Sequence, residues 1–285
     1  FPEIGWIWDG LEDYLTGTAL VSSYDIYYDH LGPEFEATNL LFVDSGGYEA
    51  RQDHDLSEVY NMEYHPKSWG REQHLEALGK LKTFSPLVLI SFDELNNRND
   101  LSTQIEVAKV FFSNFSEAAT DFLIKPSSNS DYLDVKEIIA DIQLMHEFDL
   151  IGLTEKELGN TLASRLQNVA TLRLALSEAG LEMPIHIFGC LDPISMWLFF
   201  LCGADVFDGL SWLRFVFHNN IPIYRNSWAA LTNQTNVPDH ELFLLGCFHN
   251  LESLNRQRLA MARFGNQPDD IELPDVDFVY FGGSI

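Results

Sequence analysis

Basic residues are scarce in this chain. Its 285 residues include 17 Lys and Arg against 43 Asp and Glu, so that the formal net charge is −26 and the pI is near 4.4. Affinity for a phosphate backbone comes largely from the counterions that Lys and Arg release. We therefore expect no broad contact with nucleic acid, unless a local basic patch or a basic flanking domain supplies it.

Cysteine and long apolar segments are also rare. The three cysteines, Cys190, Cys202 and Cys247, lie far apart and form no CxxC pair, which is typical of neither a disulfide framework nor a zinc knuckle. We expect a reducing, cytoplasmic setting. The longest apolar run, residues 194–204, has 11 residues, whereas a membrane span needs about 20, and we expect no membrane partner.

The chain begins at Phe1 with neither a methionine nor a basic leader. We expect the sequence to start at a domain boundary rather than at a signal peptide. A hydrophobic fraction of 46% and an aromatic fraction of 13% exclude a disordered chain. Adaptation to high salt also gives acidic surfaces, but 21 Phe residues favour an ordinary apolar core.

Short apolar runs that end in polar or glycine residues predict eight strands. They lie at 19–28, 40–47, 87–94, 122–128, 150–155, 185–190, 205–209 and 242–250. Between them, apolar residues at three- and four-residue spacing predict helices at 71–84, 100–121, 130–148 and 160–180. This alternation predicts an α/β protein with a closed (β/α)₈ TIM barrel as a single domain over 1–285, and a doubly wound open sheet is the alternative.

Three further segments need separate predictions. Residues 211–240 and the acidic tail 267–285 show little regular pattern, and we expect loops or partner-facing pieces there. The apolar residues 197–201 are predicted to form a buried helix that packs on the barrel, and an interface between subunits is the alternative.

Polar side chains follow several of the predicted strands. Because the active sites of such barrels lie at the carboxyl ends of the strands, we expect these side chains to converge on one pocket. A carboxylate there can accept two hydrogen bonds from a guanine-like base, or attack an anomeric carbon as a nucleophile. Taken singly, each has a simpler interpretation, as a helix cap or a solvated strand end. The residues are Asp44, Asp93, Glu94, Lys125, Thr154, Glu155 and Asp208.

Six short motifs, taken in order, resemble the tRNA-guanine transglycosylase (queuine tRNA-ribosyltransferase) family, which exchanges guanine in a nucleic acid for a 7-deazaguanine. That family carries DSGGF, FDE, GGL, a strand ending in MG, MFD followed by an arginine, and HNL. The resemblance spans residues 40–251. The matching segments are DSGGY (44–48), FDE (92–94), IGL (151–153), FG (188–189), VFD (206–208) with Arg214, and HNL (249–251).

The resemblance implies two catalytic carboxylates. Asp208 resembles the nucleophile that attacks the ribose anomeric carbon and forms a glycosyl-enzyme ester. Asp44 resembles the general acid/base that serves the departing and arriving bases. Arg214 resembles the arginine that holds a phosphate or orients the site.

The resemblance also implies a base pocket. Asp93 resembles the reader of the guanine edge, and the backbone of Gly152 and Leu153 resembles the segment that contacts the polar groups of the base. Tyr48 and Phe188 match the residues that sandwich the purine, and stacking is worth roughly 1–3 kcal/mol per base. Gly189 would keep the floor of this pocket open.

The sequence departs from the family at its zinc site and at one base-reading segment. The family's zinc needs three cysteines as CxCxxC together with the histidine of HNL, but residues 215–240 contain no cysteine and only His249 remains. We predict no zinc, no other cofactor and no zinc-binding subdomain, with His249 in a capping or packing role. The family's VQGG is replaced by residues 125–128, KPSS.

Two more departures concern carboxylates. Glu49 stands where the family has glutamine. Residues 151–157, IGLTEKE, replace GGLAVGE, so that either Glu155 or Glu157 supplies an additional carboxylate.

Two hypotheses of different class follow from the resemblance. The first is an enzyme that exchanges guanine for a 7-deazaguanine on a substrate other than tRNA, as in relatives that act on DNA or occur in antiphage-defence gene clusters. The second is a non-catalytic module that binds a 7-deazaguanine or a partner protein. The family works as homodimers or heterodimers, and we expect an oligomer. Retention of Asp208 favours the enzyme.

Overall fold

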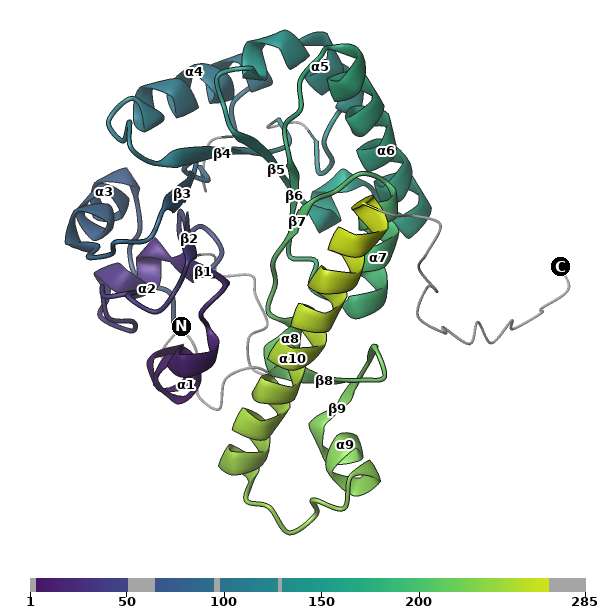
Figure 1. The fold of residues 1–285 in the computed structure, drawn as a ribbon. Coiled ribbons are helices and arrows are strands. Elements are labelled where there is room, and N and C mark those ends of the chain that lie inside the picture. Colours follow the sequence, from purple (N-terminus) through teal and green to yellow (C-terminus); the bar gives the residue numbers. More distant parts are fainter. Residues whose placement is uncertain (1–3, 51–64, 95–97, 128–129, 267–285) are drawn as a thin grey trace, which may run out of the picture.

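The computed structural model describes residues 4–50, 65–94, 98–127 and 130–266, and it is an α/β protein. Seven strands alternate with helices along the chain (Figure 1). The strands are β1 (Thr18–Ser22), β2 (Leu40–Asp44), β3 (Leu87–Ile90), β4 (Ala119–Ile124), β5 (Leu150–Thr154), β6 (Ile185–Phe188) and β7 (Val206–Phe207). The helices that accompany them are α1 (Ile4–Leu11), α2 (Ser23–Tyr27), α3 (Arg71–Lys80), α4 (Leu101–Phe112), α5 (Val135–Ala140), α6 (Leu162–Glu178) and α7 (Pro193–Leu201). Short 3₁₀ turns occur at Glu12–Tyr14, Ile142–Met145 and Glu155–Leu158.

All seven strands are parallel, and they pair in the order of the sequence from β1 to β7. A doubly wound sheet reverses its strand order at a switch point, and this sheet does not. It curls into a half-barrel with helices along its outer side (Figure 1). This arrangement is compatible with a TIM-like barrel and confirms the α/β part of the fold prediction.

The prediction of an eighth strand at 242–250 was wrong. These residues lie inside α10 (Asp239–Asn266), a helix of 28 residues. Buried positions in α10 recur at three to five residues, as Leu242, Cys247, Asn250, Ser253, Gln257 and Met261. That spacing belongs to one face of a helix. Short apolar runs do not by themselves distinguish a strand from a buried helix.

The sheet is apolar on both faces because alternate residues point to opposite sides. On the outer face, Leu41, Leu89 and Ile151 join the main core with the surrounding helices. On the inner face, Phe42, Val88, Ile90, Leu123, Leu150 and Phe188 form a second cluster. The same alternation places Asp44 on the inner side with Phe42.

Side-chain caps begin the helices that follow four of the strands, and Asp134 caps α5 by accepting the Lys136 N–H at 2.9 Å. Asp100 accepts a hydrogen bond from the backbone N–H of Thr103 at the start of α4, at 2.9 Å. Asp192 accepts one from Ser195 N–H before α7, at 2.8 Å. Thr161 and Ser164 form a reciprocal capping box at the start of α6. Each cap satisfies a backbone N–H that the first turn of a helix leaves without a partner.

Segment 211–240 is regular, contrary to the prediction. It contains α8 (Ser211–Arg214), the antiparallel hairpin of β8 (Phe215–His218) and β9 (Ile221–Tyr224), and α9 (Arg225–Leu231). Two positive-φ residues, Asn219 and Asn220, make the two-residue turn of the hairpin, as a type I′ turn requires. The predicted tail 267–285 lies outside the described residues.

Helix α10 packs against both the hairpin of β8 and β9 and the helices beside the sheet. Asn250 is fully buried, and it accepts a hydrogen bond from Phe217 N–H and donates to the carbonyls of Trp212 and Phe215, each at 2.7 Å. Ile7 and Leu11 of α1 pack with Cys247 of α10 in a separate cluster. Residues 197–201 form the end of α7, where Phe199 is fully buried, as predicted for a helix that packs on the barrel.

Candidate functional site

Asp44 ends β2 and opens the turn that the sequence motif predicted. Gly46, at a φ of +80°, donates its backbone N–H to Asp44 Oδ2 at 3.0 Å. Burial, followed by the charges of Asp208 and Asp93, raises the pKa of Asp44 to about 6. A carboxyl with such a pKa holds and releases a proton near neutral pH, which suits a general acid/base.

Asp208 follows β7, across the inner side of the sheet from β2. Its Oδ1 accepts a hydrogen bond from the backbone N–H of Gly189 at 2.9 Å. Gly189 has a φ of +77°, and a side chain there would meet open space. The glycine therefore serves the backbone conformation that aims its N–H at Asp208. The side chain of Asp208 is 22% exposed, so that solvent or a ligand can reach it.

Asp93 is buried and forms part of an ion-pair cluster. Lys125 Nζ lies 3.3 Å from Asp93 Oδ2, 3.0 Å from Glu157 Oε2 and 3.1 Å from Thr154 Oγ1. Arg98 also pairs with Glu157, at 2.9 Å. Glu155 instead pairs with Arg165 at 2.8 Å. Of the two glutamates that the sequence left open, Glu157 is therefore the one joined to Asp93 through Lys125.

The predicted base pocket involves a very close approach at Gly152. A Cβ at this position would lie 2.5 Å from the Phe188 ring and 2.9 Å from Asp121 Oδ1, so that only glycine fits. The Leu153 side chain is fully buried in the outer core, which leaves its backbone for the site. Tyr48 is 41% exposed, whereas Phe188 is 9% exposed.

The remaining predicted residues lie on the segment after β7. Arg214 ends α8. Burial and the charge of Glu49 raise the pKa of Tyr48, and the charge of Arg214 partly opposes this increase. His249 Nε2 lies 3.2 Å from the Phe217 carbonyl oxygen, and its ring lies 5.5 Å from that of Trp228. This is a packing role.

The residues around His249 do not fit the family's zinc. Tetrahedral zinc needs four ligands, and the only cysteine within forty residues of His249 is Cys247. Across 4–50, 65–94, 98–127 and 130–266, no group of three or more His, Cys, Asp or Glu side chains is arranged to hold a metal ion.

Two buried polar residues were missed by sequence reasoning. Asp121 of β4 and His186 of β6 are both fully buried on the inner face of the sheet, and Asp121 Oδ2 lies 2.7 Å from His186 Nδ1. Asp121 immediately precedes the predicted strand 122–128, and His186 lies inside the run 185–190. The signal was a charged or titratable residue at an inward position of an otherwise apolar strand.

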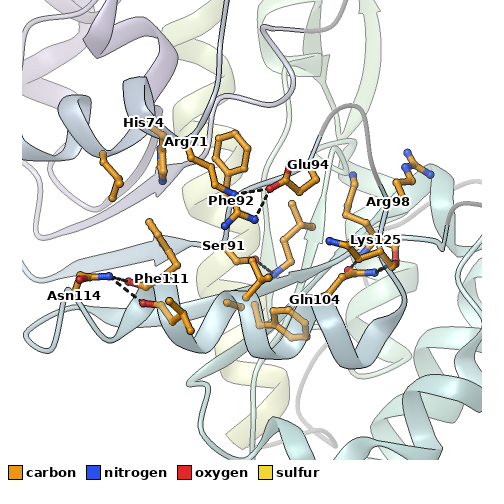
Figure 2. Close-up of a pocket in the computed structure, with 17 residues that line it drawn as sticks. Arg71, His74, Ser91, Phe92, Glu94, Arg98, Gln104, Phe111, Asn114 and Lys125 are labelled. Carbon is orange, nitrogen blue, oxygen red and sulfur yellow. Dashed lines mark hydrogen bonds and ion pairs between the residues drawn. The ribbon is translucent and has the colours of Figure 1, made fainter.

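One cavity, of about 180 Å³, lies beside these strand ends, and its lining includes Glu94 but not Asp44, Asp93 or Asp208 (Figure 2). It is lined by α3, α4 and the ends of β3 and β4, with Arg71 paired to Glu94 at its rim. Lys125 lines this cavity as well as contacting Asp93. Its volume is below the roughly 300 Å³ at which ligand pockets usually begin.

Lys125→Met is expected to destabilise the protein by about 3 kcal/mol, because it leaves Asp93 and Glu157 as buried carboxylates with less compensating charge. Urea denaturation at neutral pH measures the change. Lys82→Met is the matched control, since Lys82 and Glu34 form a surface pair with side chains 71% and 65% exposed, and such pairs contribute little. Equal stability of the two variants would show that Lys125 does not balance buried charge.

Comparison of the chain with protein-family models gives no match, and comparison with curated proteins gives none either. Within the part of the chain that the structure describes, no helix has both the length and the apolar character needed to cross a membrane.

Proposed function

We propose that this protein is a base-exchange transglycosylase, which replaces guanine by a 7-deazaguanine on a nucleic acid other than tRNA. One observation carries the proposal. Asp44 and Asp208, from opposite sides of the curved sheet, lie close enough that the charge of Asp208 raises the pKa of Asp44, and Asp93 adds to this effect. Pairs of carboxyl groups with divided roles perform the two displacements of retaining glycosyl transfer.

In the proposed reaction, an Asp208 oxygen forms a bond to the anomeric carbon while the bond from that carbon to the base nitrogen breaks. The electron pair stays on the base, which takes a proton from Asp44. The arriving base then loses a proton to Asp44 and attacks the same carbon, and the ester oxygen leaves as the Asp208 carboxylate.

Asp93 is proposed to accept hydrogen bonds from the edge of the base. Lys125 would donate to a carbonyl oxygen on the same edge, because its ammonium group lies 3.3 Å from the Asp93 carboxylate. Guanine and 7-deazaguanines present a donor beside a carbonyl oxygen, whereas adenine presents an acceptor beside an amino group. The acidic net charge supports an acceptor other than tRNA.

One observation favours the second candidate, a non-catalytic module that binds a 7-deazaguanine. The formal net charge of −26 leaves little to hold a nucleic-acid substrate, whereas a free base needs no phosphate contacts. Binding without exchange would then be the sole activity. The retained carboxylate at Asp208 favours the enzyme.

Guanine and a panel of 7-deazaguanines should bind the wild-type chain in a calorimetric titration, and Asp93→Asn should weaken that binding by at least about tenfold, because hydrogen bonds to a charged partner are worth about 1.5–3 kcal/mol. Adenine is the control ligand and should not bind. Equal affinity of both proteins for guanine would contradict the role of Asp93. An absence of binding by the wild-type chain would contradict both candidate functions.

A further inference from the structure

A buried aspartate and a buried histidine connect the interior of the sheet to Asp208. Asp121 of β4 and His186 of β6 are each 0% exposed, and both lie on the inner face of the sheet. Asp121 Oδ2 is 2.7 Å from His186 Nδ1. On the other side of the imidazole ring, Nε2 is 3.6 Å from Asp208 Oδ1. The three side chains therefore form a continuous line from the interior of the sheet to its carboxyl end.

The imidazole ring is held in this orientation by aromatic side chains. Phe188 stacks on it with ring centroids 3.8 Å apart and an interplanar angle of 30°, and Phe42 meets it edge-on at 5.7 Å. Phe188 in turn packs against Gly152, where no side chain could be accommodated. Neither ring nitrogen can turn away from its carboxylate without displacing these aromatic rings.

The negative charges of Asp121 and Asp208 stabilise the protonated, positively charged form of the buried His186 ring. Burial lowers the pKa of His186, but the charge of Asp121, its hydrogen bond to the ring and the charge of Asp208 outweigh burial and raise the pKa to about 9. A buried ion pair is a poor way to gain stability, because apolar side chains of similar volume often do as well or better. One carboxyl oxygen, Asp121 Oδ1, also has no hydrogen-bond partner within the described ranges. The buried ion pair and the Asp121 oxygen without a partner both lower stability, which favours a functional role for these residues over a structural one.

We infer that Asp121 and His186 are positioning residues, which orient the Asp208 carboxylate and balance its charge for glycosyl transfer. The inference rests on the proposed function. His186 and the Gly189 N–H both face Asp208 Oδ1, which assigns Oδ2 to the attack on the anomeric carbon. The imidazolium also offsets the repulsion between the charges of Asp208 and Asp44.

The charge balance changes during the reaction. When Oδ2 forms the ester, Asp208 loses its negative charge and the Asp121–His186 pair is left neutral overall. When the ester oxygen departs in the second displacement, the carboxylate re-forms against the imidazolium and the Gly189 N–H. The distance of 3.6 Å exceeds that of a hydrogen bond, and catalytic contacts of this kind often shorten only when substrate is bound.

The test uses Asp121→Asn and His186→Gln in the full chain. Each variant should lower kcat for base exchange by roughly 10²-fold, which is typical when one preorganised electrostatic contact is removed, while the dissociation constant for guanine changes less than about threefold. His74→Gln is the matched control, because His74 is equally buried, contacts Ser23 and lies on α3 away from Asp208. Its kcat should stay within about twofold of the wild-type value.

Nitrogen NMR of the histidine rings supplies a readout that needs no turnover. At pH 7.5, His186 should be an imidazolium in the wild-type chain and neutral in Asp121→Asn, and Asp208→Asn should shift its Nε2 resonance. A neutral His186 in the wild-type chain would overturn the inference. So would unchanged kcat in both variants, or a loss of guanine binding as large as the loss of kcat. A wild-type chain without exchange would count against the proposed function alone, since the ring signals still report the contact with Asp208.

Discussion

Asp208→Asn is expected to lower the rate of base exchange by at least about 10⁴-fold, because an amide does not form the glycosyl ester and removal of a nucleophile is among the most damaging changes to an enzyme. Guanine affinity should change less than about threefold, since the asparagine Oδ1 can still accept the Gly189 N–H. Exchange is measured by incorporation of a labelled base into DNA, RNA and nucleosides.

Asp205→Asn is the control for that variant. Asp205 directly precedes β7, at the opposite end of the strand from Asp208, where it pairs with Arg173 and accepts the Ile185 N–H at 2.9 Å. Its loss should lower stability slightly and leave the exchange rate within about twofold. If Asp208→Asn retained more than a tenth of the wild-type rate, Asp208 would not be the nucleophile.

Glu49→Gln is expected to stabilise the protein at alkaline pH. Glu49 is buried, and burial, with the nearby charges of Asp25 and Asp44, raises its pKa to about 8. The folded state therefore binds more protons than the unfolded state between about pH 4.5 and 8, and the stability of the wild-type chain falls as the pH rises through that range. Each pH unit costs about 1.4 kcal/mol. Glutamine carries no charge and can still accept the hydrogen bond that Ser22 Oγ donates at 2.9 Å.

Urea denaturation at pH 5 and pH 8.5 measures this effect. The variant and the wild-type chain should differ little at pH 5, whereas at pH 8.5 the variant should be more stable by on the order of 4 kcal/mol. Glu178→Gln at the exposed end of α6 should change stability little at either pH. A difference between Glu49→Gln and the wild-type chain that is the same at both pH values would show that Glu49 does not change its charge across this range.

Most of the sheet could be predicted from the sequence, because buried parallel strands are continuous apolar runs. Five of the predicted runs contain β2, β3, β5, β6 and β7 in full. The run 122–128 covers only the second half of β4, and the run 19–28 covers β1 from its second residue before the chain turns into α2 at Ser23. The last run, 242–250, is equally apolar but belongs to α10. This run differs from the strands in the segments that it contacts. Leu242 packs with Val216 of β8 and Trp228 of α9. Asn250 accepts a hydrogen bond from the Phe217 N–H of β8. Those contacts are tertiary and leave no local pattern.

The candidate site was only partly predictable, for a related reason. Asp44 and Asp208 follow apolar runs, so that the rule for strand ends places them at the same edge of the sheet. Asp121 and His186 lie within the strands, where a polar residue reads as an interruption of the run. Their pairing across β5, 65 residues apart in sequence, depends on the register of β4, β5 and β6. The Lys125 cluster depends in the same way on neighbouring strands.

The most direct test of the account is to trap the proposed ester on Asp208. The wild-type chain is incubated with DNA and RNA oligonucleotides in the absence of added base, quenched in acid, and analysed by intact mass and peptide mapping. We expect a glycosyl adduct on the peptide that contains Asp208, which is absent from Asp208→Asn and lost when 7-deazaguanine is added before the quench. An adduct on another residue, or exchange of labelled base in a chain that never forms an adduct, would contradict the account.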